Sequence, residues 1–385
     1  MEREYRICTR CLMDTSDPEI QFDEQGVCNH CHDYDRLILQ RVMKGEAGLR
    51  YLEGLVEQIK SDGRGKPYDC LMGMSGGVDS TYVAYVVKHK FGLRPLAIHM
   101  DNGWDSELAV KNIEETLKRL EIDLFTNVLD WEEFKNLQLA FLKASTPDSE
   151  IPSDHAIWAV TGDMAEKLKV RYILTGFNVR TETHLPRAWS QGHFDWKYIQ
   201  SVNRQFGKAK LKTYPHQGFF TYYRRLLSLR RVDILNYMDY NKLEAMRLLE
   251  RELGWKYYGG KHHESIYTRF YQGYILPTKF GYDKRRSHLS SQVCSGEISR
   301  EAALAEIQQA AYAPSLQEED REYVSKKLSL NDAEFNAVMN LPRKSYWDYP
   351  SYGRILEGPL LKGVYNGLRN LYRGMQRQRN RVQGA

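Results

Sequence analysis

The sequence contains no apolar run that approaches the length of a membrane-spanning helix and no apolar segment behind a basic start. We therefore expect neither a transmembrane helix nor a secretory signal, and the expected location is the cytoplasm. The 385 residues are 42% hydrophobic and the mean hydropathy is −0.60, which is ordinary for a soluble protein. A chain of this length exceeds one small domain, so two or three structural units are expected.

A large excess of one charge is also absent, because the net charge is only +5 and the isoelectric point about 8.7. This mild positive charge suits RNA, but it equally suits the phosphates of nucleotides and sugar nucleotides, so it does not separate these ligands. The 26 tyrosines are more unusual, and many of them fall in residues 198–282. Their rings either line a substrate cleft or fill half-buried packing positions.

Cysteine is scarce, and four of the six cysteines form two Cys-x-x-Cys pairs. Two such knuckles can place four thiolates tetrahedrally around one Zn²⁺. A redox pair and unligated thiols are the alternatives. His30 and His32 flank the second pair, but the simplest interpretation leaves them outside the coordination shell. Four thiolates leave no position for water, so the expected role of the zinc is structural. The predicted ligands are Cys8, Cys11, Cys28 and Cys31, whereas Cys70 and Cys294 stand alone.

The stretch Met-Ser-Gly-Gly-Val-Asp-Ser, residues 74–80, follows an apolar run at 68–74 and precedes a helical pattern at 81–90. Strand, tight loop and helix start suit phosphate binding, because glycines let the backbone bend sharply and the helix start offers unpaired N–H groups. A carboxylate at Asp79 would repel phosphate unless a cation lay between them, so the loop predicts Mg²⁺. The alternative is a chance glycine turn.

No lysine stands at the start of this helix, which excludes the Gly-x-x-x-x-Gly-Lys-Ser/Thr loop. The stretch resembles the pyrophosphate loop (PP loop), Ser-Gly-Gly-x-Asp-Ser, of the N-type ATP pyrophosphatases, which include asparagine, GMP and NAD synthetases and tRNA-thiolating enzymes. The resemblance implies an enzyme that cleaves ATP between the α and β phosphates, joins AMP to a carbonyl oxygen and lets a nucleophile displace the AMP.

Strands and helices alternate after the loop, with strands predicted at 94–100, 123–128 and 172–175 and helices at 106–120, 131–144 and 155–167. This order predicts an α/β fold with a doubly wound parallel sheet, whose ligand site lies beyond the carboxyl ends of the strands. The resemblance implies that His99 and Met100 lie near adenine and Gly176 near the ribose or phosphates. His99 is equally open to interpretation as a hydrogen-bonded histidine that never touches ligand. The predicted nucleotide site is Met74, Ser75, Gly76, Gly77, Val78, Asp79, Ser80, His99, Met100, Gly176 and Asn178.

The remainder of the chain is less regular. Residues 180–220 lack clear periodicity, which next to a predicted active site favours a lid or binding loop. Helices are predicted at 232–240, 242–253 and 297–310. The C-terminal stretch is either a peripheral membrane or partner-docking helix or a frayed basic tail. This stretch, residues 354–385, ends with Arg369, Arg373, Arg377, Arg379 and Arg381.

Four side chains join Asp79 as candidate catalytic residues. Lys279 and Lys284 lie in a basic stretch at 279–288 and are predicted to contact departing pyrophosphate, with a solvated helix face as the alternative. Asp154 and His155, just before a predicted helix, could orient an amide or accept a proton from attacking ammonia. The alternative there is an N-cap aspartate beside a packed histidine.

Five motifs occur in order: the double Cys-x-x-Cys, Met-Ser-Gly-Gly-Val-Asp-Ser, His-Met-Asp-Asn-Gly-Trp, Leu-Thr-Gly-Phe-Asn and Lys-Phe-Gly-Tyr-Asp-Lys-Arg-Arg-Ser-His. Over nearly the whole chain this arrangement resembles the N-acetyl sugar amidotransferases of the WbpG and PseA type, from LPS O-antigen and flagellin-glycan biosynthesis. The resemblance implies an enzyme that uses ATP, Mg²⁺ and a structural Zn²⁺. It implies that this enzyme converts the N-acetyl group of a nucleotide-activated sugar into an acetamidino group, and a UDP-linked sugar is the favoured substrate.

No glutaminase is recognisable in the chain, since there is no N-terminal cysteine nucleophile and neither isolated cysteine has a nucleophile setting. The resemblance implies a separate glutaminase subunit and a cyclase-like subunit that conducts ammonia, and no nucleic acid partner. The main alternative is a tRNA-thiolating ATP pyrophosphatase, which would need a sulfur-carrying cysteine near ATP. A zinc-dependent scaffold that binds nucleotide without turnover is a further alternative, disfavoured by Asp79.

These patterns divide the chain into five parts. They are a zinc module (1–35), a helical linker (36–66), a PP-loop ATP pyrophosphatase domain with a lid (67–220), a mainly helical substrate and pyrophosphate-binding region (221–353) and a basic C-terminal tail (354–385).

Overall fold

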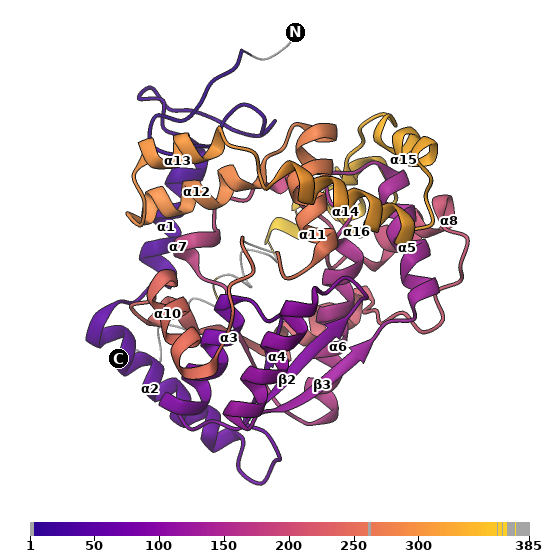
Figure 1. The fold of residues 1–385 in the computed structure, drawn as a ribbon. Helices are drawn as coiled ribbons and strands as arrows, with labels where there is room; N and C mark the ends of the chain where they lie inside the picture. Colours follow the sequence, from indigo (N-terminus) through magenta and orange to yellow (C-terminus); the bar gives the residue numbers. More distant parts are fainter. Residues whose placement is uncertain (1–3, 261–262, 360, 364, 368–373, 375–385) are drawn as a thin grey trace.

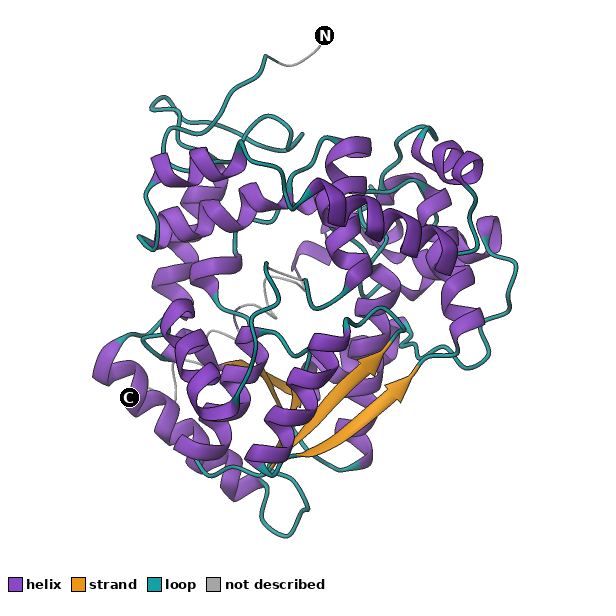
Figure 2. Ribbon diagram, in the orientation of Figure 1, coloured by secondary structure: helices purple, strands orange, loops and turns teal. Residues whose placement is uncertain are grey.

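The computed structural model of the protein describes residues 4–260, 263–359, 361–363, 365–367 and 374 (Figure 1). Five parallel strands form one sheet in the order β3-β2-β1-β4-β5 (Figure 2). The strands are β1 (Cys70–Gly73), β2 (Pro95–Asp101), β3 (Asp123–Val128), β4 (Tyr172–Thr175) and β5 (Arg230–Asp233). The predicted α/β fold with a parallel sheet is confirmed, and its loop after β1 gives it the PP-loop form.

Both faces of the sheet are buried under helices, which makes it doubly wound. Along β1, Leu71 points into one apolar core, while Cys70 and Met72 belong to the other. A parallel strand that is covered on both sides is apolar throughout, as β1 is over its first three residues. The first core includes residues of α5 (Trp131–Ala144), α6 (Ile151–Lys167) and α8 (Trp196–Phe206). The second includes residues of α2 (Gly45–Asp62), α3 (Val78–Tyr85), α4 (Glu107–Leu120) and α10 (Lys242–Leu253).

The order of the strands fixes the position of the site. The chain moves outward from β1 to β2 and β3, and then returns to the other side of β1 to form β4 and β5. In such a sheet the carboxyl ends of β1 and β4 border the crevice where ligands bind, because the connections leave these neighbouring strands in opposite directions. The PP loop follows β1, and the Gly-Phe-Asn stretch follows β4.

Several of the remaining helices, α11 to α14 among them, lie beyond the carboxyl ends of the strands (Figure 1). Helix α12 contacts α1, α7 and α13. The bounds are α1 (Asn29–Arg41), η1 (Val86–Lys90), α7 (Val179–Glu182), η2 (Arg187–Trp189), α9 (Phe219–Ser228), η3 (Ile234–Tyr237), α11 (Ile266–Phe270), η4 (Tyr271–Phe280), α12 (Lys284–Ser295), α13 (Arg300–Ile307), α14 (Pro314–Lys327), α15 (Asp332–Met339), η5 (Tyr346–Asp348) and α16 (Tyr352–Leu356).

One prediction from the sequence is wrong, and another holds only in part. The helix expected at 232–240 is replaced by β5 and the short η3, because Val232 pairs with Leu174 of β4 and tertiary pairing outweighs local propensity. The segment 180–220 is irregular over 183–195, apart from η2, and over 207–218, but it also contains α8. The apolar side of that helix, Tyr198, Ile199 and Val202, is fully buried in the first core.

Two boundaries and the role of one helix also differ from the expected ones. Helix α1 continues to Arg41 and so crosses the limit drawn at residue 35. Helix α2 is part of the second core through Leu52, Leu55 and Ile59, so it is more than a linker. Helix α6 begins at Ile151 and therefore contains Asp154 and His155. The predicted tail residues Arg369, Arg373, Arg377, Arg379 and Arg381 lie outside the described residues.

Within the described part of the chain, no helix has both the length and the apolar character that crossing a membrane requires.

Candidate active site

The PP loop turns sharply between β1 and α3 because Gly76 has a backbone φ of +76°, in the left-handed region. A Cβ on Gly76 would also lie 2.7 Å from the carbonyl oxygen of Ala109 in α4. Both the conformation and the space thus require glycine here. The close approach to α4 fixes the direction in which the following N–H groups point.

The polar groups of the loop are held by long hydrogen bonds. The Oγ atoms of Ser75 and Ser80 lie 3.2 Å apart, the Gly77 N–H donates to Ser75 Oγ at 3.3 Å, and the Val78 N–H donates to the Tyr258 hydroxyl at 3.3 Å. Bonds of this length are weaker than the usual 2.9–3.0 Å, which is about the commonest N–H to oxygen distance. Phosphate oxygens could therefore replace these partners at little cost.

Asp79 lies in the first turn of α3, where the loop after β4 meets the PP loop. Gly176 approaches so closely that a Cβ there would lie 2.9 Å from backbone and side-chain atoms of Asp79. The half-buried Asp79 carboxylate accepts a hydrogen bond from the Tyr240 hydroxyl. The structure thus brings together Asp79 and Gly176, which are 97 positions apart in the sequence. The carboxylate is of the type that Mg²⁺ prefers.

The His99 side chain contacts the backbone at the start of the PP loop. Its Nδ1 lies 2.9 Å from the Met74 carbonyl oxygen and its Nε2 lies 3.3 Å from the Asp105 carboxylate. Burial lowers the pKa of His99, but the hydrogen bond and charge of Asp105 outweigh burial and raise this pKa above its ordinary value. This position agrees with the hydrogen-bonded histidine that was the alternative to an adenine contact.

Two further nucleotide-site candidates have structural partners. The Met100 side chain is buried in the first core. Asn178 is the N-cap of α7, and its Oδ1 accepts hydrogen bonds from the Thr181 N–H at 3.1 Å and the Thr181 hydroxyl at 2.9 Å. Any contact of Met100 with adenine would therefore have to use its backbone.

Residues that follow α10 contact the PP loop, although the sequence patterns did not identify them as site residues. The Trp255 Nε1–H donates to the Gly76 carbonyl oxygen at 2.9 Å, and a Cβ on Gly77 would lie 3.7 Å from Glu264 Oε1. The Ser106 N–H donates to the Glu264 carbonyl oxygen at 2.8 Å, which ties this stretch to the loop after β2. The aromatic composition of 255–258 was visible in the sequence, but nothing in it gave the distance to the loop.

The two candidate pyrophosphate lysines have partners in the helical region. Lys279 donates to the Val338 carbonyl oxygen, and burial together with the charge of Arg343 lowers the pKa of Lys279 to about 8. Lys284 lies 3.6 Å from the Glu150 carboxylate. Burial lowers the pKa of Lys284, but nearby carboxylates outweigh burial and raise it. These contacts account for both ammonium groups without phosphate.

His155 is fully buried, and both of its ring nitrogens are in use. Its Nδ1 lies 2.8 Å from the His193 carbonyl oxygen, and its Nε2 accepts the Gln217 N–H at 3.1 Å. Burial lowers the pKa of His155 to about 4, so the ring is neutral. This is the packed histidine of the alternative interpretation.

Asp154 faces a different histidine, His193. The Nδ1 of His193 lies 3.0 Å from the Asp154 carboxylate, and its Nε2 lies 2.8 Å from Ser190 Oγ, which donates to Asp148 at 2.5 Å. Because both ring nitrogens face acceptors, the imidazolium form is favoured. Burial lowers the pKa of His193, but Asp154 and Asp148 outweigh it and raise the pKa to about 9. We call Asp148, Asp154, Ser190 and His193 the His193 cluster.

The His193 cluster is tied to the edge of the sheet where the PP loop lies. The side-chain amide of Asn102, just after β2, donates to Ser153 Oγ in the first turn of α6 at 3.0 Å. Asp154 is the next residue of that helix. The cluster thus offers a polar, charged group for a reacting amide, and sequence periodicity had given no signal for His193.

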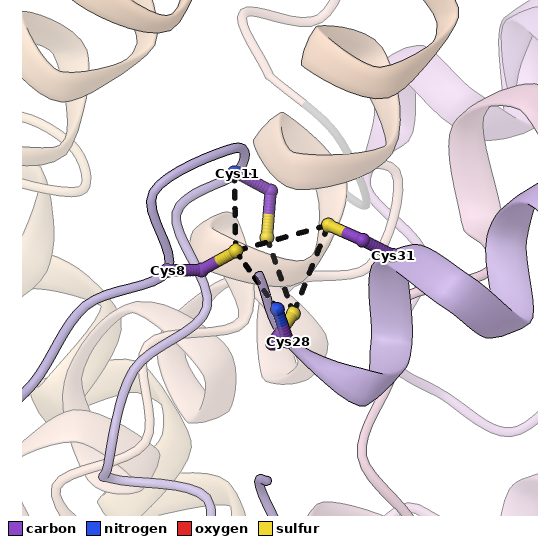
Figure 3. Close-up of side chains that lie close together, drawn as sticks. All are labelled: Cys8, Cys11, Cys28 and Cys31. Carbon is purple, nitrogen blue, oxygen red and sulfur yellow. Dashed lines mark hydrogen bonds between the residues drawn. The ribbon is translucent and has the colours of Figure 1, made fainter. Parts of the chain in front are cut away.

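The four paired cysteines come together as predicted, with their side chains pointing to one centre (Figure 3). All four are fully buried, and the Sγ to Sγ distances are 3.6 Å for Cys11 to Cys28, 3.7 Å for Cys28 to Cys31 and 3.8 Å for Cys8 to Cys31. Tetrahedral zinc with Zn–S bonds of about 2.3 Å requires thiolates about 3.8 Å apart, so the four residues fit the ion. N–H groups of Cys11 and Cys28 lie 3.4 and 3.3 Å from Cys8 Sγ and offset thiolate charge.

The two isolated cysteines have different environments. Cys70 is fully buried in β1, and burial raises the pKa of its thiol, which makes it a poor nucleophile. Cys294 is half-buried at the end of α12, and its Sγ lies 3.8 Å from Cys31 Sγ. Cys70 therefore lacks the reactive setting that the tRNA-thiolating alternative requires of a sulfur-carrying cysteine.

Comparisons with known proteins give one family match. Residues 264–361 match the model for the C-terminal domain of WbpG-like LPS biosynthesis proteins. An uncharacterized protein of Methanocaldococcus jannaschii is 25% identical over 172 residues, which are 44% of this chain and 58% of that protein. The chain therefore spans somewhat more than half the length of this curated relative.

Two synthetases are among the solved structures that have similarity to the chain. NMN synthetase from Francisella tularensis has a TM-score of 0.36 at 12% identity, over 77% of this chain and 98% of that one. NH₃-dependent NAD synthetase from Campylobacter jejuni, in complex with nitrate, has a TM-score of 0.32 at 12% identity, over 78% and 96% of the two chains. TM-scores this low support no inference about function.

Proposed function

Since the chain carries a WbpG-like C-terminal domain at residues 264–361 beside a PP loop, we propose that it is an ATP-dependent N-acetyl sugar amidotransferase. It adenylates the N-acetyl amide oxygen of a nucleotide-activated sugar, and ammonia then displaces AMP to leave an acetamidino sugar. The UDP-linked sugars of LPS O-antigen or related surface glycans are the favoured substrates.

One observation carries this proposal: the first residues of the matched domain are built into the PP-loop site. Glu264 lies beside Gly77, and its carbonyl oxygen accepts the Ser106 N–H. The Ile266 N–H donates to the Trp104 carbonyl oxygen at 2.9 Å. A domain that begins at the nucleotide loop is well placed to hold the second substrate of the same reaction.

The chemistry suits a PP-loop enzyme because an amide carbon is a poor electrophile and its oxygen a very poor leaving group. Attack of the amide oxygen on the α-phosphorus of ATP forms an O-adenylyl imidate and releases pyrophosphate. Ammonia adds to the activated carbon, and expulsion of AMP leaves the amidine. N–H groups of the PP loop would bind the phosphates, and Asp79 would hold Mg²⁺, which offsets their charge. Asp154 of the His193 cluster is our candidate to orient the amide or accept a proton from ammonia, because His193 itself is already protonated.

Ammonia would come from a separate glutaminase subunit through a cyclase-like subunit. This part of the proposal rests on the sequence resemblance described above. We propose no role for nucleic acid, and the zinc held by the four paired cysteines would be structural.

The test measures pyrophosphate released from ATP with Mg²⁺ and ammonium chloride, in the presence of UDP- and CMP-linked N-acetyl sugars or bulk tRNA. We expect release only with a sugar nucleotide, whose product mass shows replacement of oxygen by NH. Release with tRNA alone would overturn the proposal in favour of RNA modification. Nucleotide binding without release, in every mixture including one with a purified glutaminase and cyclase pair, would favour a scaffold.

A further inference from the structure

A second group of potential metal ligands adjoins the zinc cysteines. It consists of Cys31 at the start of α1, His184 after α7 and Cys294 in the last turn of α12. Cys31 Sγ lies 3.8 Å from Cys294 Sγ, and Cys294 Sγ lies 3.6 Å from His184 Nε2. All three potential ligand atoms lie within 4.8 Å of one another. Three separate parts of the chain therefore converge on one point.

Two of the three distances between potential ligand atoms agree with those around a tetrahedral zinc ion. With Zn–S bonds of about 2.3 Å and Zn–N bonds of about 2.05 Å, two thiolates lie about 3.8 Å apart and a thiolate and an imidazole nitrogen about 3.6 Å apart. The observed distances are 3.8 Å for Cys31 to Cys294 and 3.6 Å for Cys294 to His184.

The hydrogen bonds of His184 leave the correct nitrogen for a metal. Ser291 Oγ lies 3.2 Å from the Ser287 carbonyl oxygen and 2.9 Å from His184 Nδ1, so when the hydroxyl donates to that carbonyl it accepts from His184 Nδ1. With the proton on Nδ1, the lone pair is on Nε2, which faces Cys294. Such a hydrogen bond on the far nitrogen is the usual way in which proteins orient a metal-binding histidine. His184 is also fully buried, which restricts its ring to this orientation.

We propose that Cys31, His184 and Cys294 hold a second Zn²⁺, with the Cys31 thiolate bridging it to the zinc of the paired cysteines. This inference is independent of the proposed function. Four thiolates around one Zn²⁺ leave a net charge of −2 in a fully buried site, which the nearby Arg300 guanidinium, bound to the Cys8 and Cys11 carbonyl oxygens, offsets only from outside the sulfur cluster. A second Zn²⁺ with the Cys294 thiolate reduces that excess to one, which favours the binuclear arrangement electrostatically.

The second ion would have three protein ligands, in contrast to the first. A zinc with three protein ligands keeps a fourth position for water or a small external ligand. Cys294 is only half-buried, so this position is on the accessible side of the pair. The ligand class expected at the site is a thiophilic divalent cation, of which Zn²⁺ is the probe to use.

The experiment counts zinc by mass spectrometry of the metal in the full chain, reduced, loaded with excess ZnSO₄ and desalted. We expect two zinc ions per chain in the wild type and one in Cys294→Ser and in His184→Gln. Replacement with Co²⁺ should give a thiolate-to-cobalt absorption band that decreases in Cys294→Ser, while circular dichroism shows that the fold is kept.

The matched control is His32→Ala, which removes a histidine beside Cys31 in the sequence whose ring pairs with Asp23 instead. This variant should keep two zinc ions. One zinc ion in the wild type, or an unchanged count in Cys294→Ser, would overturn the proposal. A disulfide between Cys31 and Cys294 in reduced, zinc-loaded protein, detected as a peptide pair, would overturn it as well.

Discussion

Gly76→Ala should destabilise the protein through two separable effects at the PP loop. Placing alanine at a φ of +76° costs about 1–2 kcal/mol, because a left-handed conformation brings Cβ against the following carbonyl oxygen. The new Cβ would also lie 2.7 Å from the Ala109 carbonyl oxygen, and crowding of this kind costs roughly 1–3 kcal/mol. Alanine also reduces the conformational entropy of the unfolded chain, which stabilises the folded protein by about 0.4–1 kcal/mol and partly offsets these two costs. The free energy of unfolding should therefore fall by about 3 kcal/mol.

Gly281→Ala provides a matched control at the end of η4. Gly281 has a φ of +75°, but a Cβ there would have no atom within 4 Å outside its chain neighbours. Only the conformational cost applies, so the free energy of unfolding should fall by about 1 kcal/mol. The difference between the two variants measures the close approach of the PP loop to α4.

Urea unfolding followed by tryptophan fluorescence gives both values, and pyrophosphate release at a temperature where each variant is folded gives the functional effect. Folded Gly76→Ala should release little pyrophosphate, because movement away from α4 redirects the N–H groups of the loop, whereas Gly281→Ala should keep wild-type release. If Gly76→Ala were no more destabilising than Gly281→Ala, the claim that the Gly76 Cβ would clash with the Ala109 carbonyl oxygen would be refuted.

Three further predictions concern the metals and the His193 cluster. Asp79→Asn keeps the shape of the side chain but loses its charge, so pyrophosphate release should fall at least about 100-fold, while the exposed Asp239→Asn control should be unaffected; near-normal release in Asp79→Asn would contradict the Mg²⁺ assignment. Cys28→Ser should release zinc and lower the unfolding temperature, and an unchanged metal content would show that the paired cysteines do not bind it. Because the pKa of His193 is raised from 6.5 to about 9, its stabilising effect is complete below pH 6.5 and is lost as the pH rises through 9. The free energy of unfolding should fall by roughly 1–2 kcal/mol over this pH range, because solvent screens the ion pair with the half-exposed Asp154. This pH dependence should be absent in His193→Gln. If His193→Gln kept the same pH dependence, another group would be its cause.

The local elements of the sheet could be predicted from sequence because their signals are local. Apolar runs bounded by glycine and polar residues identified β1, β2, β3 and β4, and helix α10 was located to the residue. Strand β5 could not be found in this way. Its sequence Arg-Arg-Val-Asp is weakly apolar, and it becomes a strand only through hydrogen bonds to β4.

The zinc knuckles and the PP loop were likewise determined by sequence. Cys-x-x-Cys spacing places two thiolates on one turn, and the Ser-Gly-Gly-Val-Asp-Ser order specifies a loop before a helix start, so neither depends on distant contacts. The side chains that contact these motifs, in contrast, are determined by distant contacts. Tyr240 and Tyr258 reach the PP loop from positions 161 and 180 residues away, and no periodicity encodes such a distance.

Side-chain roles were decided by the tertiary structure, because a role depends on which groups face each other. His155 and His193 each follow polar or glycine residues in the sequence. Burial lowers the pKa of His155, whose Nε2 accepts the Gln217 N–H, so its ring is neutral. Asp154 and Asp148 raise the pKa of His193, so its ring is charged. Cys294 stood alone in the sequence and lies beside Cys31 in the fold. The sequence by itself thus determined the loop, the knuckles and most of the sheet through short-range patterns, whereas the packing of distant segments decided the charges and partners of the side chains.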